Sequence, residues 1–439
     1  MEVAIVTIVG RPNVGKSSLF NRMVGCRHAI VDDQPGVTRD RIYTEVEWKG
    51  RTFYIVDTGG LSKTGKDFDN SVHEQVKYAI DESDVLLLVI DTKVGVTPLD
   101  EEIALEMRKT KKPIIVVGNK VDDVVHEDRI HELYTLGFDN VIGVSAEHGR
   151  NIDELMDKVW EFLPTEVQQE RGEEDNSIIN LALVGRPNVG KSSLLNYLSK
   201  EKRSLVSDIP GTTRDSVDTL VEINGINFRV IDTAGLRRKS RMDGSIEFYS
   251  MVRTLQAVDR CDVAVLIMED SAICTDQDKK IANHVIERGK GLILVVNKWD
   301  KISKDEKIGD IVKRKIREEM AFCNFAPILF TSARTGRGIS KLPELVLKVK
   351  KNRERVLSEE KLFALVHDLL AFERLPSNSK GKRLEIRKCK QVSVKPPKFC
   401  FFVNDPSIVN RSFVRHIINI LRKMDDFEGS PLRVVWKKG

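Results

Sequence analysis

A ten-residue stretch that occurs twice, letter for letter, constrains this chain more than any other feature. The copies run from Gly10 to Leu19 and from Gly185 to Leu194, and both read GRPNVGKSSL. Each copy follows an apolar run typical of a buried strand and precedes a helical pattern, the setting in which G-x-x-x-x-G-K-[ST] forms a phosphate-binding loop. In such a loop the backbone N–H groups and the helix N-terminus point at phosphate oxygens. Because a chance match in two identical settings is negligible, the sequence predicts two phosphate sites.

The lysine and the first serine of each copy have separate tasks. Lys16 and Lys191 can reach the β- and γ-phosphates of a nucleotide, and the hydroxyls of Ser17 and Ser192 can bind Mg²⁺. The expected phosphate-binding residues are Gly10, Arg11, Pro12, Asn13, Val14, Gly15, Lys16, Ser17 and Ser18 in the first copy, and Gly185, Arg186, Pro187, Asn188, Val189, Gly190, Lys191, Ser192 and Ser193 in the second.

Four further motifs are shared by the two halves of the chain, which indicates a duplicated domain rather than a short-period solenoid. The spacing between partners is 175 positions for the phosphate loops and the next two motifs, then 178 and 187, so the second copy carries insertions. The pairs are PGVTRD at 35–40 with PGTTRD at 210–215, VDTGGL at 56–61 with IDTAGL at 231–236, NKVD at 119–122 with NKWD at 297–300, and Ser145-Ala146 with Ser332-Ala333.

Strand-length apolar runs alternate with helix-length segments in both copies, which favours doubly wound α/β domains with a parallel sheet covered on both faces. The motifs follow the strands directly, at the sheet edge where such folds bind ligands. A hairpin is expected in each copy, around Lys49-Gly50 and Asn224-Gly225. Strands are expected at Val3–Val9, Thr44–Trp48, Thr52–Val56, Val85–Ile90, Ile114–Val117 and Val141–Val144, and at Ile178–Val184, Val217–Ile223, Phe228–Ile231, Val263–Ile267, Leu292–Val296 and Ile328–Phe330.

The last part of the chain has a different pattern. Helices are expected at Glu359–Phe372 and Arg411–Met424, and strands at Leu384–Val394, Lys398–Val403 and Leu432–Trp436. This α-β-β-α-β order is typical of a small α+β sandwich. We therefore expect a first domain at residues 1–163, a polar, acidic linker at 164–177, a second domain at 178–350 and a third at 351–439.

Positive charge is concentrated in the third domain. Residues 351–439 hold 20 lysines and arginines against 10 aspartates and glutamates, whereas the whole chain of 439 residues has a formal net charge of only +5. A polyanionic partner is therefore expected there, and a merely solvated basic face is the alternative. The surplus includes Lys380, Lys382, Arg383, Arg387, Lys388, Lys390, Lys395 and Lys398.

The cysteines and the hydropathy of the chain indicate a cytoplasmic setting. No two of the six cysteines form a C-x-x-C pair, so we expect reduced thiols that mostly fill the core. No secretory leader is visible and no apolar run is long enough to span a bilayer, so a soluble protein is expected. The cysteines are Cys26, Cys261, Cys274, Cys323, Cys389 and Cys400.

Taken together, the motifs resemble the five signature regions of Ras-like GTPases. The resemblance implies a Mg²⁺ site in which a strand-end aspartate acts through water and a threonine joins when GTP is present, namely Asp57 with Thr38 and Asp232 with Thr213. It also implies that Gly60 and Gly235 offer a backbone N–H to the γ-phosphate. The neighbouring residues of the same motif, also expected to bind GTP, are Thr58, Gly59, Thr233 and Ala234.

The N-K-x-D motifs select the base in this resemblance. The carboxylates of Asp122 and Asp300 can accept from guanine N1–H and N2–H₂ together, and adenine offers no such pair of donors. Asn119 and Asn297 are expected to brace the loop. The stems of Lys120 and Lys298 are expected along the purine, and the N–H groups of Ser145, Ala146, Ser332 and Ala333 at guanine O6.

One position departs from the Ras-like pattern. Where a glutamine would orient the attacking water, this chain has Leu61 and Leu236, which form no hydrogen bonds through their side chains, so unaided hydrolysis should be slow. Asn13 and Asn188 match an asparagine that K⁺-activated GTPases of this group use near the phosphates. K⁺ would then supply the positive charge of an arginine finger. Loop capping by an Asx turn is the alternative role for these asparagines.

Two tandem GTPase domains followed by a small basic domain resemble the Der (EngA) family of bacterial GTPases, which act in assembly of the large ribosomal subunit. The resemblance covers essentially the whole chain and includes PPKF at 396–399, FVNDP at 402–406 and FEGSP at 427–431. It implies two P-loop NTPase (Ras-like) domains, a KH-like third domain, GTP and GDP as ligands, and the large subunit with its ribosomal RNA as partner. We expect a monomer that does not act on DNA.

The third domain departs from ordinary KH domains in one respect. No G-x-x-G occurs in residues 351–439, and this is the loop that clamps RNA backbone in KH domains. Packing against a GTPase domain to report its nucleotide state is therefore an alternative role. Two other functions stay open for the whole chain, a GTPase with a different client such as RNA modification, and a nucleotide-gated scaffold with a weakly hydrolysing site.

Overall fold

The computed structural model of the chain describes residues 3–25, 43–58, 76–77, 79–122, 129–164, 178–200, 218–231, 245–269, 271–301, 306–372, 375–378 and 381–439. It divides into two compact units, residues 1–174 with 241–252, and residues 175–240 with 253–439.

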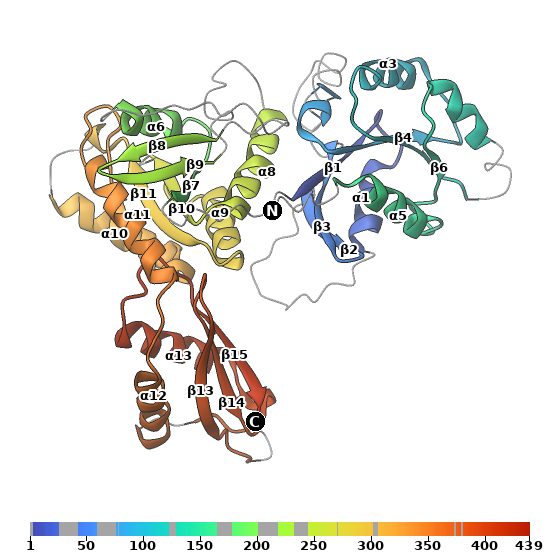
Figure 1. The fold of residues 1–439 in the computed structure, drawn as a ribbon. Helices are drawn as coiled ribbons and strands as arrows, with labels where there is room; N and C mark the ends of the chain where they lie inside the picture. The colour runs from blue at the N-terminus through green and yellow to red at the C-terminus, as the bar shows by residue number, and fades with distance from the viewer. Residues whose placement is uncertain are drawn as a thin grey trace. The chain divides into compact units, whose positions relative to one another are not determined.

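The first α/β domain has one six-stranded sheet in the order β2-β3-β1-β4-β5-β6. All strands are parallel except β2, which pairs antiparallel with β3 at the edge. The helices α1 and α5 pack on one face of the sheet and α3 lies on the other (Figure 1). Every residue of β4 and β5 is buried, which explains the continuous apolar runs in the sequence. The elements are β1 (Ala4–Val9), α1 (Lys16–Gly25), β2 (Tyr43–Trp48), β3 (Arg51–Asp57), β4 (Val85–Asp91), α3 (Pro98–Met107), β5 (Ile114–Asn119), η2 (Arg129–Leu136), β6 (Val141–Gly143) and α5 (Ile152–Phe162).

The second α/β domain repeats this topology, with the sheet order β12-β11-β10-β7-β9-β8. Residues of α6 and α11 share the core on one face of the sheet, and α9 contacts β10 and β11. The elements are β7 (Ile178–Val184), α6 (Lys191–Lys200), β8 (Thr219–Ile223), β9 (Ile226–Val230), α8 (Ser245–Arg260), β10 (Val263–Glu269), α9 (Asp276–Glu287), β11 (Gly291–Asn297), η3 (Trp299–Lys301), α10 (Glu306–Glu319), η4 (Ala321–Cys323), β12 (Ile328–Phe330), η5 (Ile339–Lys341) and α11 (Leu342–Arg353).

Both predicted hairpins are confirmed. The turn residues Lys49 and Gly50 have φ values of 46° and 78°, and Asn224 and Gly225 have 54° and 76°. Two successive positive φ angles define the type I′ turn, whose twist matches that of the flanking strands. The hairpins place the antiparallel edge strand at the same position in both sheets.

The C-terminal domain is a three-stranded sheet with two helices on the same side of it (Figure 1). The predicted α-β-β-α-β order is confirmed, although β13 begins at Ile386 rather than Leu384, and β15 continues to Lys438. In this sheet β14 is central, antiparallel to β13 and parallel to β15. The elements are α12 (Glu359–Phe372), β13 (Ile386–Ser393), β14 (Lys398–Val403), η6 (Pro406–Ile408), α13 (Arg411–Met424) and β15 (Arg433–Lys438).

The C-terminal domain is hydrogen-bonded to the second α/β domain. Gly429 N donates to Phe325 O, and Gly429 O accepts from Leu292 N, both at 2.8 Å. Gly429 has a φ of 75°, and a Cβ there would lie 2.2 Å from Val349 Cγ2. Only glycine therefore fits at the centre of this contact. The contact lies at the start of β11, at the opposite end of that strand from the N-K-x-D motif.

Three other expectations concern the chain as a whole. All five described cysteines are free and buried, as expected for core residues, and Cys26 lies outside the described residues. Of the linker expected at 164–177, residues 165–177 also lie outside them. The boundary expected after residue 350 falls inside α11, which continues to Arg353. Among the described helices, none combines the length and the apolarity needed to cross a bilayer.

Candidate nucleotide-binding site

Both phosphate loops leave the end of a central strand and enter a helix, β1 into α1 and β7 into α6. Gly15 and Gly190 have φ values of 94° and 100°. A Cβ would lie 2.3 Å from the side-chain nitrogen of Asn119 in the first loop, and 2.2 Å from that of Asn297 in the second. Glycine is therefore needed at these positions for two reasons. It adopts the positive φ of the loop, and it leaves room for the asparagine side chain.

The loop lysines fold back over their own loops. Lys16 Nζ donates to the carbonyl oxygens of Gly10 and Arg11, both at 2.8 Å. Lys191 Nζ makes the corresponding two bonds in the second loop, both at 2.7 Å. Burial lowers the pKa of each ammonium group to about 8. A phosphate beside either group would favour its charged form and raise that pKa.

A hydroxyl and a carboxylate meet where β3 ends and α1 begins. Ser17 Oγ donates to Asp57 Oδ2 at 2.6 Å. Next in the chain, Thr58 Oγ1 donates to Ile8 O at 2.8 Å and ties the segment after β3 to β1. Hard oxygen donors from a hydroxyl and a carboxylate fit Mg²⁺, which binds few protein groups and keeps water or phosphate oxygens. In the second copy, Asp232 lies outside the described residues.

One asparagine in each copy joins two loops. Asn119 Nδ2 donates to Val14 O at 2.9 Å, and Asn119 Oδ1 accepts from Ala146 N at 3.1 Å. Asn297 bonds Val189 O at 2.9 Å and accepts from Ala333 N at 3.2 Å. Each asparagine therefore holds its phosphate loop against the loop that carries the Ser-Ala motif.

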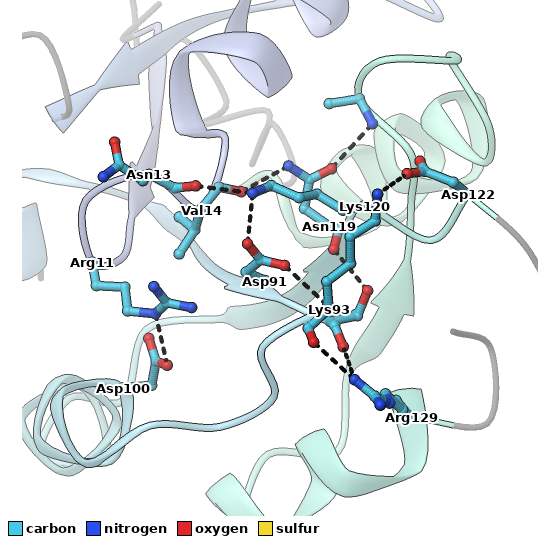
Figure 2. A network of polar contacts seen from close by, with 12 residues as sticks. Arg11, Asn13, Val14, Asp91, Lys93, Asp100, Asn119, Lys120, Asp122 and Arg129 are labelled. Carbon is cyan, nitrogen blue, oxygen red and sulfur yellow. Dashed lines mark hydrogen bonds and ion pairs between the residues drawn. The ribbon is translucent and has the colours of Figure 1, made fainter. Parts of the chain in front are cut away.

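The lysine of each N-K-x-D motif pairs with an acid at the end of the neighbouring strand. Lys120 Nζ lies 2.6 Å from Asp91 Oδ2 and also donates to Asn13 O at 3.1 Å (Figure 2). Lys298 Nζ lies 2.8 Å from Glu269 Oε1. These pairs hold the lysine stem across the loop, with positive φ values of 70° and 61° at the two lysines.

The aspartate of each motif accepts a serine hydroxyl and pairs with a cation. Ser145 Oγ donates to Asp122 Oδ1 at 2.8 Å. Lys93 Nζ lies 2.7 Å from Asp122 Oδ2, a pair that Figure 2 shows. The bonds from Lys93 and Ser145 lower the pKa of the Asp122 carboxyl. In the second copy, Ser332 Oγ donates to Asp300 Oδ1 at 2.6 Å and Arg334 Nε lies 3.1 Å from Asp300 Oδ2. Each carboxylate is thus oriented by one serine hydroxyl and one cation.

The N–H groups of the Ser-Ala loops, which the sequence predicts at guanine O6, are hydrogen-bonded within the protein. Ser145 N donates to Arg150 O at 3.2 Å and Ala146 N to Asn119 Oδ1, so both groups close the loop itself. Ser332 and Ala333 are engaged in the same way. The next N–H groups, those of Glu147 and Arg334, have no hydrogen-bond partner within the described residues. The sequence could not show this, because the loop closure depends on the tertiary position of the asparagine.

A buried aspartate that the sequence motifs did not include pairs with the arginine of each phosphate loop. Arg11 Nε lies 3.3 Å from Asp100 Oδ2, and Arg186 Nε lies 3.6 Å from Asp278 Oδ1 (Figure 2 shows the first pair). Both aspartates are fully buried and close a capping box with the threonine three residues before, Thr97 in the first copy. The shared T-x-x-D spacing at the start of α3 and α9 was a helix-start signal that could have identified these aspartates.

The asparagines in the middle of the loops expose their side chains. Asn13 and Asn188 have φ values of 66° and 64°, in the left-handed region that asparagine tolerates. Within the described residues neither carboxamide forms a hydrogen bond, so the structure shows no Asx turn there. The remaining expected residues of these loops, Pro12, Ser18, Pro187 and Ser193, lie in the loops and first helical turns. The expected residues Thr38, Gly59, Gly60, Leu61, Thr213, Asp232, Thr233, Ala234, Gly235 and Leu236 lie outside the described residues.

Comparison with known proteins covers the full length of the chain. Residues 5–120 and 180–298 match the family profile described as 50S ribosome-binding GTPase, and residues 357–437 match the profile described as KH-domain-like of EngA bacterial GTPase enzymes, C-terminal. The chain is 46% identical over 428 residues to the GTPase Der of Caldicellulosiruptor saccharolyticus, which covers 97% of both proteins. It is also 46% identical to the GTPase Der of Pelotomaculum thermopropionicum, over 100% of this chain and 99% of that protein. The same identity is found with the GTPase Der of Halothermothrix orenii, over 100% of both.

Proposed function

Because this chain belongs to the GTPase Der family, we propose that GTP binding and hydrolysis in its two G domains drive a switch in assembly of the large ribosomal subunit. The observation that carries the proposal is the pair of phosphate loops, each joined by one asparagine to the loop that would hold the base. GTP would bind the segments that carry Thr38 and Gly60 in the first copy and Thr213 and Gly235 in the second, and hydrolysis would release them.

The phosphate end of each site would act mainly by charge. Lys16 and Lys191 would transfer their hydrogen bonds from loop carbonyls to phosphate oxygens, and the loop N–H groups would surround the β-phosphate. Mg²⁺ would be held in the first site by Ser17, Thr38 and, through water, Asp57. In the second site it would be held by Ser192, Thr213 and, through water, Asp232. When bound, Mg²⁺ neutralises charge on the β- and γ-phosphate oxygens.

The base end of each site would select guanine. The charged carboxylate of Asp122 or Asp300 would accept from N1–H and N2–H₂, and the serine that donates to it would fix its orientation. Guanine O6 would accept from N–H groups of the Ser-Ala loops at Ser145-Ala146 and Ser332-Ala333. The adjoining N–H groups of Glu147 and Arg334, which form no hydrogen bond within the described residues, are also available to it. Adenine would leave the carboxylate without a hydrogen-bond donor. The free energy lost by desolvating an unpaired acceptor exceeds that of the missing hydrogen bond alone.

Turnover would be slow and stimulated by K⁺. Leu61 and Leu236 cannot orient water through their side chains. The carboxamides of Asn13 and Asn188 lie in the phosphate loops and form no hydrogen bond within the described residues, so they would supply an oxygen for K⁺. In KCl and NaCl at matched ionic strength, the wild-type protein should hydrolyse GTP faster in KCl. Asn13→Ala and Asn188→Ala should reduce that difference at their own site while GDP affinity stays unchanged. Equal turnover in the two salts would exclude the K⁺ role.

Sedimentation with ribosomal subunits tests the client. The protein should co-migrate with the large subunit or its precursor in a non-hydrolysable GTP analogue and be released in GDP. A GTPase that hydrolyses GTP but never co-migrates with the large subunit has a different client. Nucleotide-dependent binding without turnover would indicate a scaffold instead.

In this proposal the domains are 1–163, 178–350 and the KH-like 351–439, with the linker at 164–177, and α11 continues across the last boundary to Arg353. The matched segments at 5–120, 180–298 and 357–437 lie inside these bounds. With a ribosomal client, the protein would act in the cytoplasm, as a monomer and without contact to DNA.

A further inference from the structure

The three strands of the C-terminal domain have one face covered by helices and one face with a distinct set of side chains. Phe399, Phe401 and Val403 of β14 belong to the core beneath α12 and α13. Because side chains alternate along a strand, Lys398, Cys400 and Phe402 lie on the other face. Residues paired across neighbouring strands share a face, so the registers extend this surface onto β13 and β15.

This face carries three rows across the sheet. The outer row is Lys388, Phe402 and Lys437, the middle row is Lys390, Cys400 and Val435, and the third row is Ser393, Lys398 and Arg433. No acidic residue lies in these rows. We call Lys388, Lys390, Lys437 and Phe402 the basic sheet face, since the third row lies beside the second G domain, where Arg433 donates to Glu287 O.

Within the described part of the chain, the lysines of the basic sheet face have no carboxylate partner. Lys388, Lys390 and Lys437 are exposed and form no ion pair within the described residues, whereas nearby Lys382 and Lys395 pair with acids at 3.4 and 3.0 Å. Lys388 Nζ instead lies 4.5 Å from the centre of the Phe402 ring. The face thus combines lysines that have no ion pair within the described residues with an aromatic ring. That ring belongs to Phe402 of β14, which lies between Lys388 on β13 and Lys437 on β15.

We infer that the basic sheet face binds single-stranded RNA, with Lys388, Lys390 and Lys437 on phosphates and Phe402 stacked on a base. Proteins bind single-stranded nucleic acid by this combination of a cationic surface and an aromatic platform. The absence of G-x-x-G removes the usual backbone clamp of KH domains, so RNA needs another surface on this domain. The inference rests on the proposed ribosomal function and narrows its RNA contact to one face.

The test uses the full chain and a fluorescein-labelled single-stranded RNA of 12 mixed nucleotides, titrated by fluorescence anisotropy at about 50 to 200 mM KCl. The variant K388Q/K390Q/K437Q should bind about 10- to 100-fold more weakly at about 50 mM KCl. The slope of log affinity against log salt should become shallower by about 2, since each phosphate contact on a single strand contributes about 0.7.

A matched control removes the same charge from elsewhere. K351Q/R415Q/K423Q neutralises three exposed cations of α11 and α13, none with an ion pair within the described residues. It should keep the wild-type affinity within about threefold and keep the salt slope. Phe402→Leu should lower affinity about tenfold without changing the slope, because stacking releases no counterions. Equal GTP turnover and equal unfolding temperatures check that the variants fold.

Three results would overturn the inference. The triple variant could bind RNA as the wild type does, or the control could lose as much affinity, which would mean that only net charge matters. Loss of binding to ribosomal subunits with unchanged RNA affinity would assign the face to a ribosomal protein. Failure of the proposed function is distinguishable, since the wild type would then bind the oligonucleotide through this face but never co-migrate with the large subunit.

Discussion

The two nucleotide sites have phosphate loops of identical sequence, but they differ at the aspartate of the N-K-x-D motif. In the first site Asp122 pairs with Lys93, from the loop after β4. In the second site Asp300 pairs with Arg334, from the loop after β12. The position that corresponds to Lys93 is Ser271, and Glu147 stands where the second copy has Arg334. In both copies the motif aspartate therefore pairs with a cation, but the cation comes from a different loop in each copy.

The second site differs further in what is attached to its sheet. The strand β11 carries the N-K-x-D motif at one end and the contact with Gly429 at the other. The duplicated domains therefore share their nucleotide loops, whereas the C-terminal domain is built onto the second copy. In that copy, β11 therefore runs from the contact with the C-terminal domain to the base-binding loop.

The largest expected effect is a loss of GTP hydrolysis when a phosphate-loop lysine is removed. The loss should be equal in the two sites. Lys16→Ala or Lys191→Ala removes a buried ammonium group from beside the phosphates and should reduce single-turnover hydrolysis at its own site by about 10²- to 10³-fold. The control Lys111→Ala removes an exposed lysine and should change nothing. Unchanged rates in both loop variants would refute the enzymatic role. A loss in only one of them would show that one site is catalytically silent.

Loop glycines provide the next test, on affinity. Gly15→Ala and Gly190→Ala place a Cβ against the asparagine amide, with φ values of 94° and 100°, and should weaken GDP binding about 100-fold at the altered site. Gly50→Ala and Gly225→Ala are matched controls, because their φ values are also positive but no atom lies within 4 Å. Titration with labelled GDP measures the affinity of the loop variants and of the control variants. Equal losses in the controls would attribute the effect to backbone strain alone.

The contact between β11 and the C-terminal domain should be sensitive to one methyl group. Gly429→Ala brings a Cβ to 2.2 Å from Val349 and should destabilise the contact by about 2–4 kcal/mol. Hydrogen exchange should accelerate in residues 291–297 and 425–431 and stay unchanged in β5. Gly381→Ala, with a φ of 79° and open space around it, is the control. Unchanged exchange would mean that the domains are not held by this contact.

Alkaline pH should weaken both sites alike. Burial lowers the pKa of Lys16 and Lys191 to about 8, and a bound phosphate raises it again. Above pH 8 the free protein must therefore take up a proton on binding GTP, so affinity should fall about tenfold from pH 7 to pH 9. Isothermal titration in two buffers of different ionisation enthalpy measures the proton uptake. A flat affinity profile would mean that the ammonium groups stay charged in the free protein.

The smallest expected effect separates the two base loops. Lys93→Ala should tighten GDP binding about two- to fivefold at the first site only, because guanine then no longer competes with an exposed ion pair for the Asp122 carboxylate. Arg334→Ala should do the same at the second site only. GDP affinity is measured in a chain in which the phosphate-loop lysine of the other site is replaced by alanine. The measured affinity then belongs to one site. Weaker binding in either variant would show that the cation helps to hold the base.

Much of the fold follows from patterns that span a few residues. The continuous run at Val85–Asp91 is buried on both faces, so its composition alone identified a central parallel strand. Two residues that adopt positive φ, such as Asn224-Gly225, specify a type I′ hairpin wherever they occur between strands. The strong period of Arg411–Met424 identified α13 to the residue. Duplication added independent evidence, since each motif was seen twice in the same order.

The sequence by itself thus determined the strands, the order of elements and the loops at which a nucleotide would bind, because short-range sterics and periodicity govern them. Only the tertiary structure decided which distant groups meet there. Asp100 reaches Arg11 across 89 positions, Lys93 rather than a neighbouring residue pairs with Asp122, and Asn119 occupies the N–H of Ala146. These contacts depend on the order of strands in the sheet, which brings together residues far apart in the chain. Patterns that span a few residues do not determine that order.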